Sequence, residues 1–276
     1  MSKIECNVCH HRCKLSENQI GLCKARSNTG EKIASINYGE ITSIALDPIE
    51  KKPLRHFYPG SEILSVGSYG CNLKCSFCQN HEISTVGKNS IQTQHANPEN
   101  LIQIALDLIP RGNIGIAYTY NEPLVGYEYV RDCALLAKKY NMKNVVVTNG
   151  CFNKVILEEI LPYIDAFNID LKSFTHEFYK KMGGDLELVK SFIKLAHTKA
   201  HIEITTLIIP DENDSEEEMV QLSSFIASID KEIPLHVSRF FPCYEMKDKK
   251  STEIKKVYDL AEIARKKLDY VYEGNC

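Results

Sequence analysis

The sequence predicts an α/β protein: a partial (β/α)6 barrel of the TIM type with a small cysteine-rich, metal-binding extension at its N-terminus. Two observations indicate this class. Short apolar runs alternate with amphipathic stretches of helical length beyond residue 60, and four of the eleven cysteines lie before residue 24. Such alternation favours a parallel sheet whose strands are joined by helical crossovers. An open doubly wound sheet is the alternative arrangement.

The individual elements follow from the apolar patterning. Strands are expected near residues 62–67, 113–119, 143–148, 165–170, 201–208 and 233–238. Helices are expected near residues 97–110, 124–140, 153–162, 186–199, 215–229 and 251–267. Ser215 precedes one helix and has Glu218 three residues later, which is the signature of a capped helix start. We expect three regions: a cysteine-rich extension over 1–60, a core over 61–246, and a C-terminal helix and tail over 247–276.

Composition limits the classes of function. The formal net charge is −3, so the sequence predicts no broad basic face and no nucleic-acid partner. No segment reads as a membrane span or a signal peptide, which predicts a cytoplasmic protein. Thiols stay reduced in that compartment, so clustered cysteines indicate metal binding rather than disulfides.

One motif carries the predicted chemistry. Cys71, Cys75 and Cys78 form a C-x3-C-x2-C pattern directly after the first strand expected in the core. Parallel α/β barrels place their active sites in the loops at the carboxyl ends of the strands. Three thiolates on one loop can bind three irons of a [4Fe-4S] cube, which leaves the fourth iron without a protein ligand. A structural zinc knuckle or a chance spacing is the alternative interpretation.

This motif and its position resemble the radical S-adenosylmethionine (SAM) superfamily. The resemblance implies that a [4Fe-4S] cluster on the three cysteines, the expected catalytic residues, binds SAM through its fourth iron. It further implies reductive cleavage of SAM to methionine and a 5′-deoxyadenosyl radical, which abstracts hydrogen from the substrate. Phe77 and Asn80, in the same loop, are then expected to contact the cofactor.

The second and third strand ends carry further candidates for cofactor binding. Tyr120, Asn121 and Glu122 occupy the position of the family's Gly-Gly-Glu motif, with the two glycines replaced. An ordinary turn into a helix is the alternative for this segment. Thr148 and Asn149 resemble part of an Asp-Thr-Asn-Gly stretch in pyruvate formate-lyase activating enzymes, whose leading Asp is replaced here by valine.

The fourth and sixth strands carry charged candidates. Asp170 and Lys172 resemble an Asp-Leu-Lys stretch of the same activating enzymes, and alternation points both side chains the same way. We expect Lys172 to contact SAM and Asp170 to orient it, the alternative being a solvated ion pair. His236 and Arg239 are expected to contact the cofactor or substrate from the sixth strand. The alternative for a lone histidine is a satisfied core or surface group.

The N-terminal cysteines form a second candidate site. Cys6, Cys9, Cys13 and Cys23 lie within eighteen residues, and four soft ligands can satisfy zinc or an iron–sulfur cluster. A structural metal, an electron-relay cluster and no metal at all are the three alternatives. Cys276, at the end of the sequence, is expected to be a free thiol.

The resemblance extends over nearly the whole chain to one branch. The sequence is similar to the pyruvate formate-lyase activating enzyme-like proteins of the AmmeMemoRadiSam-system branch. The segments that carry this similarity are 6–15, 21–26, 47–54, 235–239 and 270–275.

Three functions are considered. The first is a radical SAM enzyme that modifies a protein or peptide, as glycyl-radical activating enzymes do. The second is the same chemistry on a small molecule, and the third is a non-enzymatic iron–sulfur electron-transfer protein. The resemblance implies a flavodoxin or ferredoxin as the electron donor and an anaerobic cytoplasm.

Overall fold

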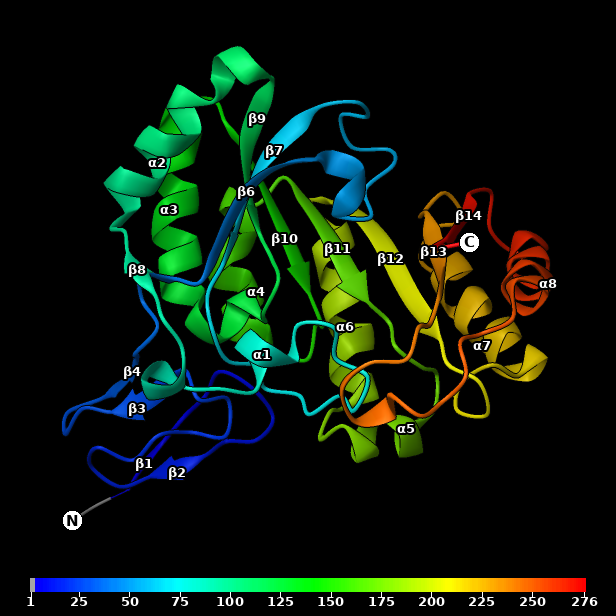
Figure 1. The fold of residues 1–276 in the computed structure, drawn as a ribbon, viewed down its shortest axis with the longest axis horizontal. Coiled ribbons are helices and arrows are strands. Elements are labelled where there is room, and N and C mark those ends of the chain that lie inside the picture. Colours follow the sequence, from blue (N-terminus) through cyan, green and yellow to red (C-terminus); the bar gives the residue numbers. More distant parts are fainter. Residues whose placement is uncertain (1–2) are drawn as a thin grey trace.

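A curved sheet of eight strands forms the centre of the protein, whose computed structural model describes residues 3–276 (Figure 1). The strand order is β14-β13-β12-β11-β10-β9-β7-β6; neighbouring strands from β7 to β14 pair in parallel, and β6 pairs antiparallel with β7. The order ends at β14 and β6, so the barrel is open along one side. The bounds are β6 Ser43–Pro48, β7 Glu62–Gly67, β9 Asn113–Tyr118, β10 Lys143–Thr148, β11 Ala166–Asp170, β12 His201–Ile208, β13 Leu235–Arg239 and β14 Val271–Gly274.

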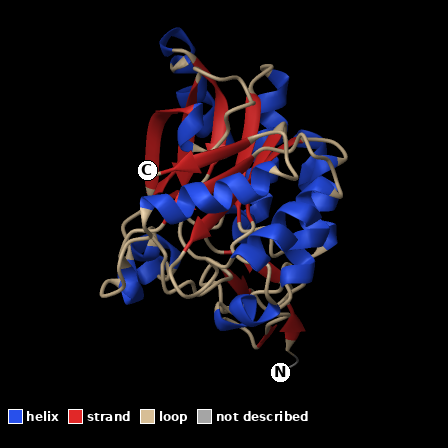
Figure 2. Cartoon of the chain, turned by 90° about the vertical axis from the view of Figure 1, so that its right-hand side faces the viewer, coloured by secondary structure: helices blue, strands red, loops and turns tan. Residues whose placement is uncertain are grey.

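The longer helices lie along the outer side of the curved sheet: in Figure 1, α2 and α3 stand to the left of the strands and α7 and α8 to the right, and Figure 2 gives the turned view. In α6, for example, Val189, Phe192 and Ile193 are buried, and the side chain of Asp185 caps the first turn. The bounds are α1 His81–Ser84, α2 Pro98–Asp107, α3 Tyr127–Lys139, α4 Lys154–Ile160, α5 His176–Lys181, α6 Leu186–His197, α7 Glu216–Ala227 and α8 Ile254–Arg265.

This architecture confirms the predicted α/β partial barrel, and each expected strand and helix is present within a few residues of its predicted ends. The predicted cap also forms, because Ser215 Oγ accepts the backbone N–H of Glu218 at 3.1 Å. The sheet extends across the expected region boundaries at 60 and 246. β6 lies before residue 60 and β14 lies after residue 246, so both ends of the chain contribute an edge strand.

The chain before β6 forms small paired strands rather than a core of its own. β1 Ile4–Glu5 pairs with β2 Lys14–Leu15, and β3 Arg26–Asn28 pairs with β4 Ile33–Ser35. β5 Glu40–Ile41 pairs with β8 Gln94–His95, which comes from beyond the cysteine loop. Sheets of two very short strands are marginal by themselves, so this region depends on its contacts with the barrel.

Those contacts place the N-terminal segment against the cysteine loop. The His11 imidazole donates to the carbonyl oxygen of Asn72 at 2.8 Å, and the His10 imidazole donates to that of Gly183 at 2.8 Å. The backbone N–H of Asn153 donates to the carbonyl oxygen of Val8 at 3.1 Å. Side chains and backbone from three barrel loops therefore fix the position of residues 8–11.

The amino-terminal end of the barrel is closed by a buried carboxylate. Glu203 of β12 accepts the backbone N–H groups of Arg55 (3.0 Å) and His56 (2.8 Å), which plug this end. It also accepts from the imidazoles of His236 (2.6 Å) and His201 (3.0 Å). The two carboxylate oxygens of Glu203 thus accept four hydrogen bonds. Two of these come from the backbone of the segment between β6 and β7 and hold that segment in place.

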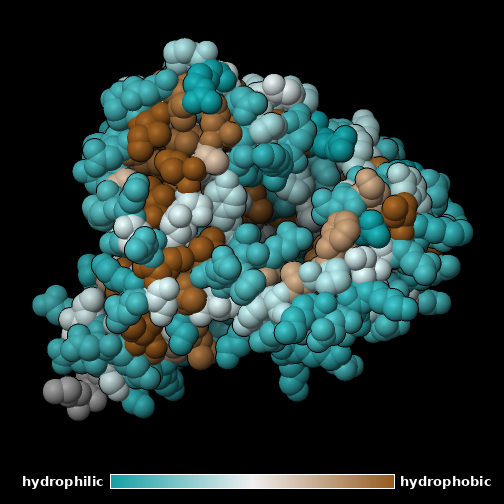
Figure 3. All heavy atoms as spheres, viewed as in Figure 1, coloured by the Kyte–Doolittle hydropathy of each residue, from teal (hydrophilic) through white to brown (hydrophobic). Residues whose placement is uncertain are grey.

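The surface is mixed in character. Apolar residues gather along the left side of the face drawn in Figure 3, and the exposed apolar side chains of the chain include Ile44 of β6 and Ile104 of α2. Among residues 3–276, no helix is both long enough and apolar enough to traverse a bilayer.

Candidate active site at the carboxyl ends of the strands

The loop after β7 presents the three cysteines of the motif. Gly70 begins it with φ +88°, and a Cβ at this position would clash with the carbonyl oxygen of Cys23, so both conformation and space require glycine. The next backbone N–H, that of Cys71, donates to the same carbonyl oxygen at 3.2 Å. The N–H of Leu73 donates to Cys71 Sγ at 3.3 Å, which fixes that sulfur.

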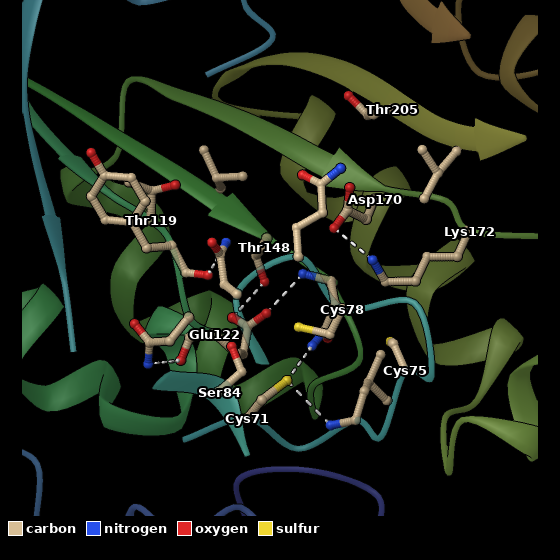
Figure 4. Close-up of a pocket in the computed structure, with 18 of the residues that line it drawn as sticks. Cys71, Cys75, Cys78, Ser84, Thr119, Glu122, Thr148, Asp170, Lys172 and Thr205 are labelled. Carbon is tan, nitrogen blue, oxygen red and sulfur yellow. Dashed lines mark hydrogen bonds and ion pairs between the residues drawn. The ribbon is translucent and has the colours of Figure 1, made fainter. Parts of the chain in front are cut away.

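These cysteines line a cavity of about 290 Å³ at the carboxyl ends of the strands (Figure 4). Its size is near the lower end for cofactor pockets. The close-up shows strand-end side chains from several parallel strands converging above the cysteine loop. The predicted site residues that line the cavity are Cys71, Cys75, Phe77, Cys78, Asn80, Tyr120, Asn121, Glu122, Thr148, Asn149, Asp170 and Lys172.

The turn after β9 is fixed against the cysteine loop. Tyr120 adopts a left-handed conformation (φ +72°), and its carbonyl oxygen accepts the Asn80 side-chain amide at 2.7 Å. Its hydroxyl donates to Asp47 at 2.8 Å. The Asn121 side chain accepts the backbone N–H of Ser68 at 2.9 Å. The Tyr120 and Asn121 side chains thus hold the turn that forms this part of the cavity wall.

Glu122 joins the ends of β9 and β10. It accepts hydrogen bonds from the Thr148 hydroxyl (2.8 Å) and from the backbone N–H groups of Asn149 (2.8 Å) and Leu124 (3.1 Å). Burial nevertheless raises the pKa of Glu122 to about 7, because the three neutral donors offset only part of the desolvation penalty. Asn149 in turn directs its side-chain amide toward Cys71 Sγ, 3.7 Å away. Glu122 therefore orients a group that touches the cysteine loop.

Lys172 places a positive charge on the opposite wall. Its ammonium lies 2.8 Å from Asp170, as the dashed line in Figure 4 shows, and 5.9 Å from the centre of the Phe77 ring. Burial alone would lower the pKa of Lys172, but the charge of Asp170 and the nearby Cys75 thiol hold that pKa above its usual value. The cavity therefore contains a permanent cation suited to a carboxylate.

The cysteine thiols are poorly placed to ionise by themselves. Burial raises the pKa of Cys71 well above its usual value, with the nearby Glu122 charge adding to the effect, and burial raises the pKa of Cys75 to about 11. Thiolates form there only when bound cations compensate, as iron does.

His236 and Arg239 do not line this cavity. The His236 imidazole is buried and bound to Glu203 at 2.6 Å. Arg239 Nε donates to the carbonyl oxygen of Thr252 at 2.7 Å, and the guanidinium stacks on Phe241. We therefore correct the prediction that these two residues contact the cofactor, because both are committed to partners elsewhere in the fold.

Several lining residues were missed. Thr205, Leu207 and Ser238 are inward-facing positions near the ends of β12 and β13, which strand alternation could have identified. Pro53 lies between β6 and β7 and Asn275 follows β14; both fall in segments that carry the family resemblance, but their place in the cavity was not predicted. The full set of further lining residues is Pro53, Leu73, Gln79, Ser84, Thr119, Val147, Thr205, Leu207, Ser238 and Asn275.

The four N-terminal cysteines lie together at a separate place. Cys6, Cys9, Cys13 and Cys23 line one cavity behind the cysteine loop, as the sequence spacing suggested. Among residues 3–276, however, no group of three or more His, Cys, Asp or Glu side chains is arranged to hold a single metal ion. The same is true of the cysteine loop. In an iron–sulfur cube each thiolate binds a different iron, so its sulfurs need not converge on one point.

Comparison with known proteins decides the family. Residues 65–223, more than half of the chain, match the Radical SAM superfamily. The chain belongs to the radical SAM superfamily. An uncharacterized protein of Methanocaldococcus jannaschii is 38% identical over 279 residues, covering 99% of this chain and 82% of that protein.

Two further radical SAM comparisons cover part of the chain. The pyruvate formate-lyase-activating enzyme of Clostridium pasteurianum is 26% identical over 165 residues, which are 58% of this chain and 67% of that enzyme. The crystal structure of Streptococcus suis SuiB bound to precursor peptide SuiA matches with a TM-score of 0.58 and 17% identity, over 75% of this chain and 47% of that one. The structural match shows the shared fold.

The radical SAM family implies a [4Fe-4S] cluster and SAM, and the residues of the cavity fit both groups. Three thiols from one loop, Cys71, Cys75 and Cys78, line a cavity that also holds the Lys172 cation. The soft thiol donors suit iron, and Lys172 suits the SAM carboxylate. Membership of this family supports an enzyme and argues against the alternative of a non-enzymatic electron carrier.

Proposed function

We propose that this enzyme cleaves SAM reductively and uses the resulting radical to abstract hydrogen from a protein or peptide substrate. One observation carries the first half: three thiols, a buried cation and the Glu122-anchored turn line a single cavity. When bound, the cluster and SAM supply electron transfer, carbon–sulfur cleavage and hydrogen abstraction.

The residues of the chain have separate tasks in this proposal. Cys71, Cys75 and Cys78 hold the cluster, and Lys172 holds the SAM carboxylate with its charge fixed by Asp170. The left-handed turn at Tyr120 presents backbone carbonyls to the SAM amino group. These groups orient the cofactor before reaction, so that no reorganisation is needed at the moment of electron transfer.

The proposed substrate class rests on the open barrel and on two relatives. The sheet ends at β6 and β14, which leaves a side through which an extended chain can reach the cavity. One relative is named an activating enzyme for pyruvate formate-lyase, and a structural neighbour holds a precursor peptide. Both names support a protein or peptide substrate over a small molecule.

We further propose a flavodoxin or ferredoxin as electron donor, an anaerobic cytoplasm as the working environment, and a bound metal at the N-terminal cysteines. An iron–sulfur cluster with an open corner reacts readily with oxygen, which is the reason for the anaerobic setting. Four soft ligands lining one cavity support the metal.

Anaerobic reconstitution tests the chemistry. The protein loaded with iron and sulfide, given dithionite and SAM, is expected to form 5′-deoxyadenosine. Cys75→Ala removes one cluster ligand and is expected to abolish that product, whereas Cys276→Ser removes an exposed thiol and should leave it unchanged. Undiminished 5′-deoxyadenosine from Cys75→Ala would exclude this cavity as the radical site.

A second experiment tests the substrate class. Extract from the source cells is separated into macromolecular and small-molecule fractions, and each is added to the reconstituted enzyme. The macromolecular fraction is expected to stimulate 5′-deoxyadenosine formation. Stimulation by the small-molecule fraction alone would favour a metabolite as substrate.

A further inference from the structure

The N-terminal cysteines share a local design with the cysteine loop. The three cysteines of the loop are spaced C-x3-C-x2-C, and Cys6, Cys9 and Cys13 have the same two spacings in the reverse order. Together with Cys23, these cysteines line one cavity. Four thiols gathered in one place are a donor set for zinc or an iron–sulfur cluster.

Arg26 supplies a second, independent sign that an anion belongs in this cavity. It lines the cavity with its side chain only 4% exposed. Its terminal nitrogens donate to Glu128 (2.6 and 2.8 Å) and to the carbonyl oxygen of Val125 (3.0 Å), but Nε is buried and has no hydrogen-bond partner within residues 3–276. An unpaired buried donor costs about 1–3 kcal/mol. A negatively charged thiolate–metal centre would remove that penalty.

The arrangement of the thiols is compatible with a cluster, in which each sulfur binds a different iron. A structural zinc ion draws four sulfurs onto one tetrahedral point. Within the described part of the chain, Cys6, Cys9, Cys13 and Cys23 line one cavity without forming such a point. The three thiols of the radical SAM motif show the same behaviour, and their family implies a cube.

The two thiol sites are adjacent. The carbonyl oxygen of Cys23 accepts the backbone N–H of Cys71 at 3.2 Å, so one hydrogen bond joins a ligand of one site to a ligand of the other. His11, two residues after Cys9, also holds the carbonyl oxygen of Asn72 through its imidazole at 2.8 Å. A redox centre in the N-terminal cavity would thus contact the radical site through the backbone.

We propose that Cys6, Cys9, Cys13 and Cys23 bind a second [4Fe-4S] cluster that passes single electrons to the radical site. A low-potential flavodoxin- or ferredoxin-type donor is oxidised by one electron, and the second cluster accepts that electron and then releases it to the radical site. With four cysteine ligands the second cluster has no open corner, so it does not bind SAM. The delivery step rests on the proposed function, whereas the presence of the cluster does not.

Metal analysis separates the second cluster from zinc. The variant Cys71→Ala/Cys75→Ala/Cys78→Ala, reconstituted anaerobically, is expected to keep about four irons and four sulfides per chain. Its reduced form should give an electron paramagnetic resonance signal that SAM does not change. The signal of Cys6→Ser/Cys13→Ser, which retains the radical-site thiols, should change with SAM. One zinc per chain in the first variant, or no metal, would overturn the second cluster.

Two substitutions then test Arg26 through the reduction potential. In the variant that lacks the radical-site thiols, Arg26→Gln removes a positive charge and a donor, so the midpoint potential of the second cluster should fall. Glu128→Gln is the matched control, because it breaks the same ion pair but leaves the guanidinium in place, and it should raise the potential. Equal shifts in the same direction would contradict a direct effect of Arg26.

Reduction kinetics test the relay. With reduced flavodoxin as donor, Cys6→Ser/Cys13→Ser should form 5′-deoxyadenosine and oxidise the flavodoxin at least about tenfold more slowly than the full protein. Dithionite should restore its 5′-deoxyadenosine rate, because a small reductant reaches the radical site directly. An undiminished rate with flavodoxin would overturn the relay. Absence of 5′-deoxyadenosine in the full protein with dithionite would instead overturn the proposed function and leave the metal and potential measurements valid.

Discussion

Two buried glutamates at opposite ends of the barrel differ sharply in their protonation. Glu122, at the carboxyl end, receives three neutral donors and has its pKa raised to about 7 by burial. Burial also acts on Glu203, at the amino end, but hydrogen bonds from two imidazoles and two backbone N–H groups outweigh it and lower that pKa to about 2. The charge of Asp170 also raises the pKa of Glu122, so burial, charge neighbours and donors together produce the difference.

The two ends of the barrel have different roles. The network of Glu203 closes the barrel and joins β12 and β13 to the segment between β6 and β7, which makes it a source of stability. Glu122 and the cation of Lys172 border a cavity and orient groups toward the cysteine loop. Barrels commonly divide stability and chemistry in this way.

The largest expected effect comes from removing the Glu203 carboxylate at the amino end of the barrel. Glu203→Ala leaves two backbone N–H groups and two imidazoles without their acceptor, and should lower the free energy of unfolding by about 3–5 kcal/mol. Urea unfolding followed by circular dichroism measures it. SAM affinity of the folded variant should be unchanged, and loss of SAM binding at unchanged stability would reverse the roles assigned to the two ends.

Lowering the pH should change the stability contributed by the two glutamates in opposite directions. The lowered pKa of Glu203 contributes about 3 kcal/mol of stability above pH 4.5, which is lost as the pH falls toward 2. The raised pKa of Glu122 does the reverse, since stability falls as the pH rises from 4.5 to 7. Unfolding curves of the metal-free protein across this range, compared with Glu203→Gln and Glu122→Gln, isolate each slope. If the two glutamates contribute slopes of stability against pH that have the same sign, their pKa values are not shifted in opposite directions.

A smaller effect is expected at the cation of the cavity. Lys172→Met keeps the volume but removes the charge, and should weaken SAM binding about 10- to 100-fold, the equivalent of one charge-assisted hydrogen bond. Anaerobic equilibrium dialysis with labelled SAM measures the affinity. Unchanged affinity would remove Lys172 from the cofactor site, and its thermal unfolding serves as the control for folding.

The smallest effect is expected at Arg239, the last residue of β13, which belongs to neither network. Arg239→Ala removes a hydrogen bond to Thr252 and should lower stability by about 1 kcal/mol. Its SAM affinity should match that of the unsubstituted protein. A marked loss in the same dialysis experiment would restore Arg239 to the cofactor site.

The residues that line the cavity were better predicted from the sequence than the buried network of Glu203 at the amino end of the barrel. Parallel strands end at one edge, so residues after each strand, from Cys71 to Lys172, were expected to meet and do line one cavity. His236 shows where this reasoning stops. Alternation identifies its strand face, and Ser238 on the same face lines the cavity, but alternation does not fix the height of a side chain within the barrel. The Glu203 partner that holds His236 lies 33 residues away in the chain.

By itself the sequence determined the element order, the inward faces of the strands and the family, because these depend on local periodicity and on a compact cysteine motif. Only the tertiary structure decided that both chain ends add edge strands, that the pKa values of Glu122 and Glu203 shift in opposite directions, and that the backbone of the N-terminal segment bonds the cysteine loop. The physical reason is distance along the chain. Burial, hydrogen-bond partners and charge neighbours at each of these places are set by segments that meet only after folding.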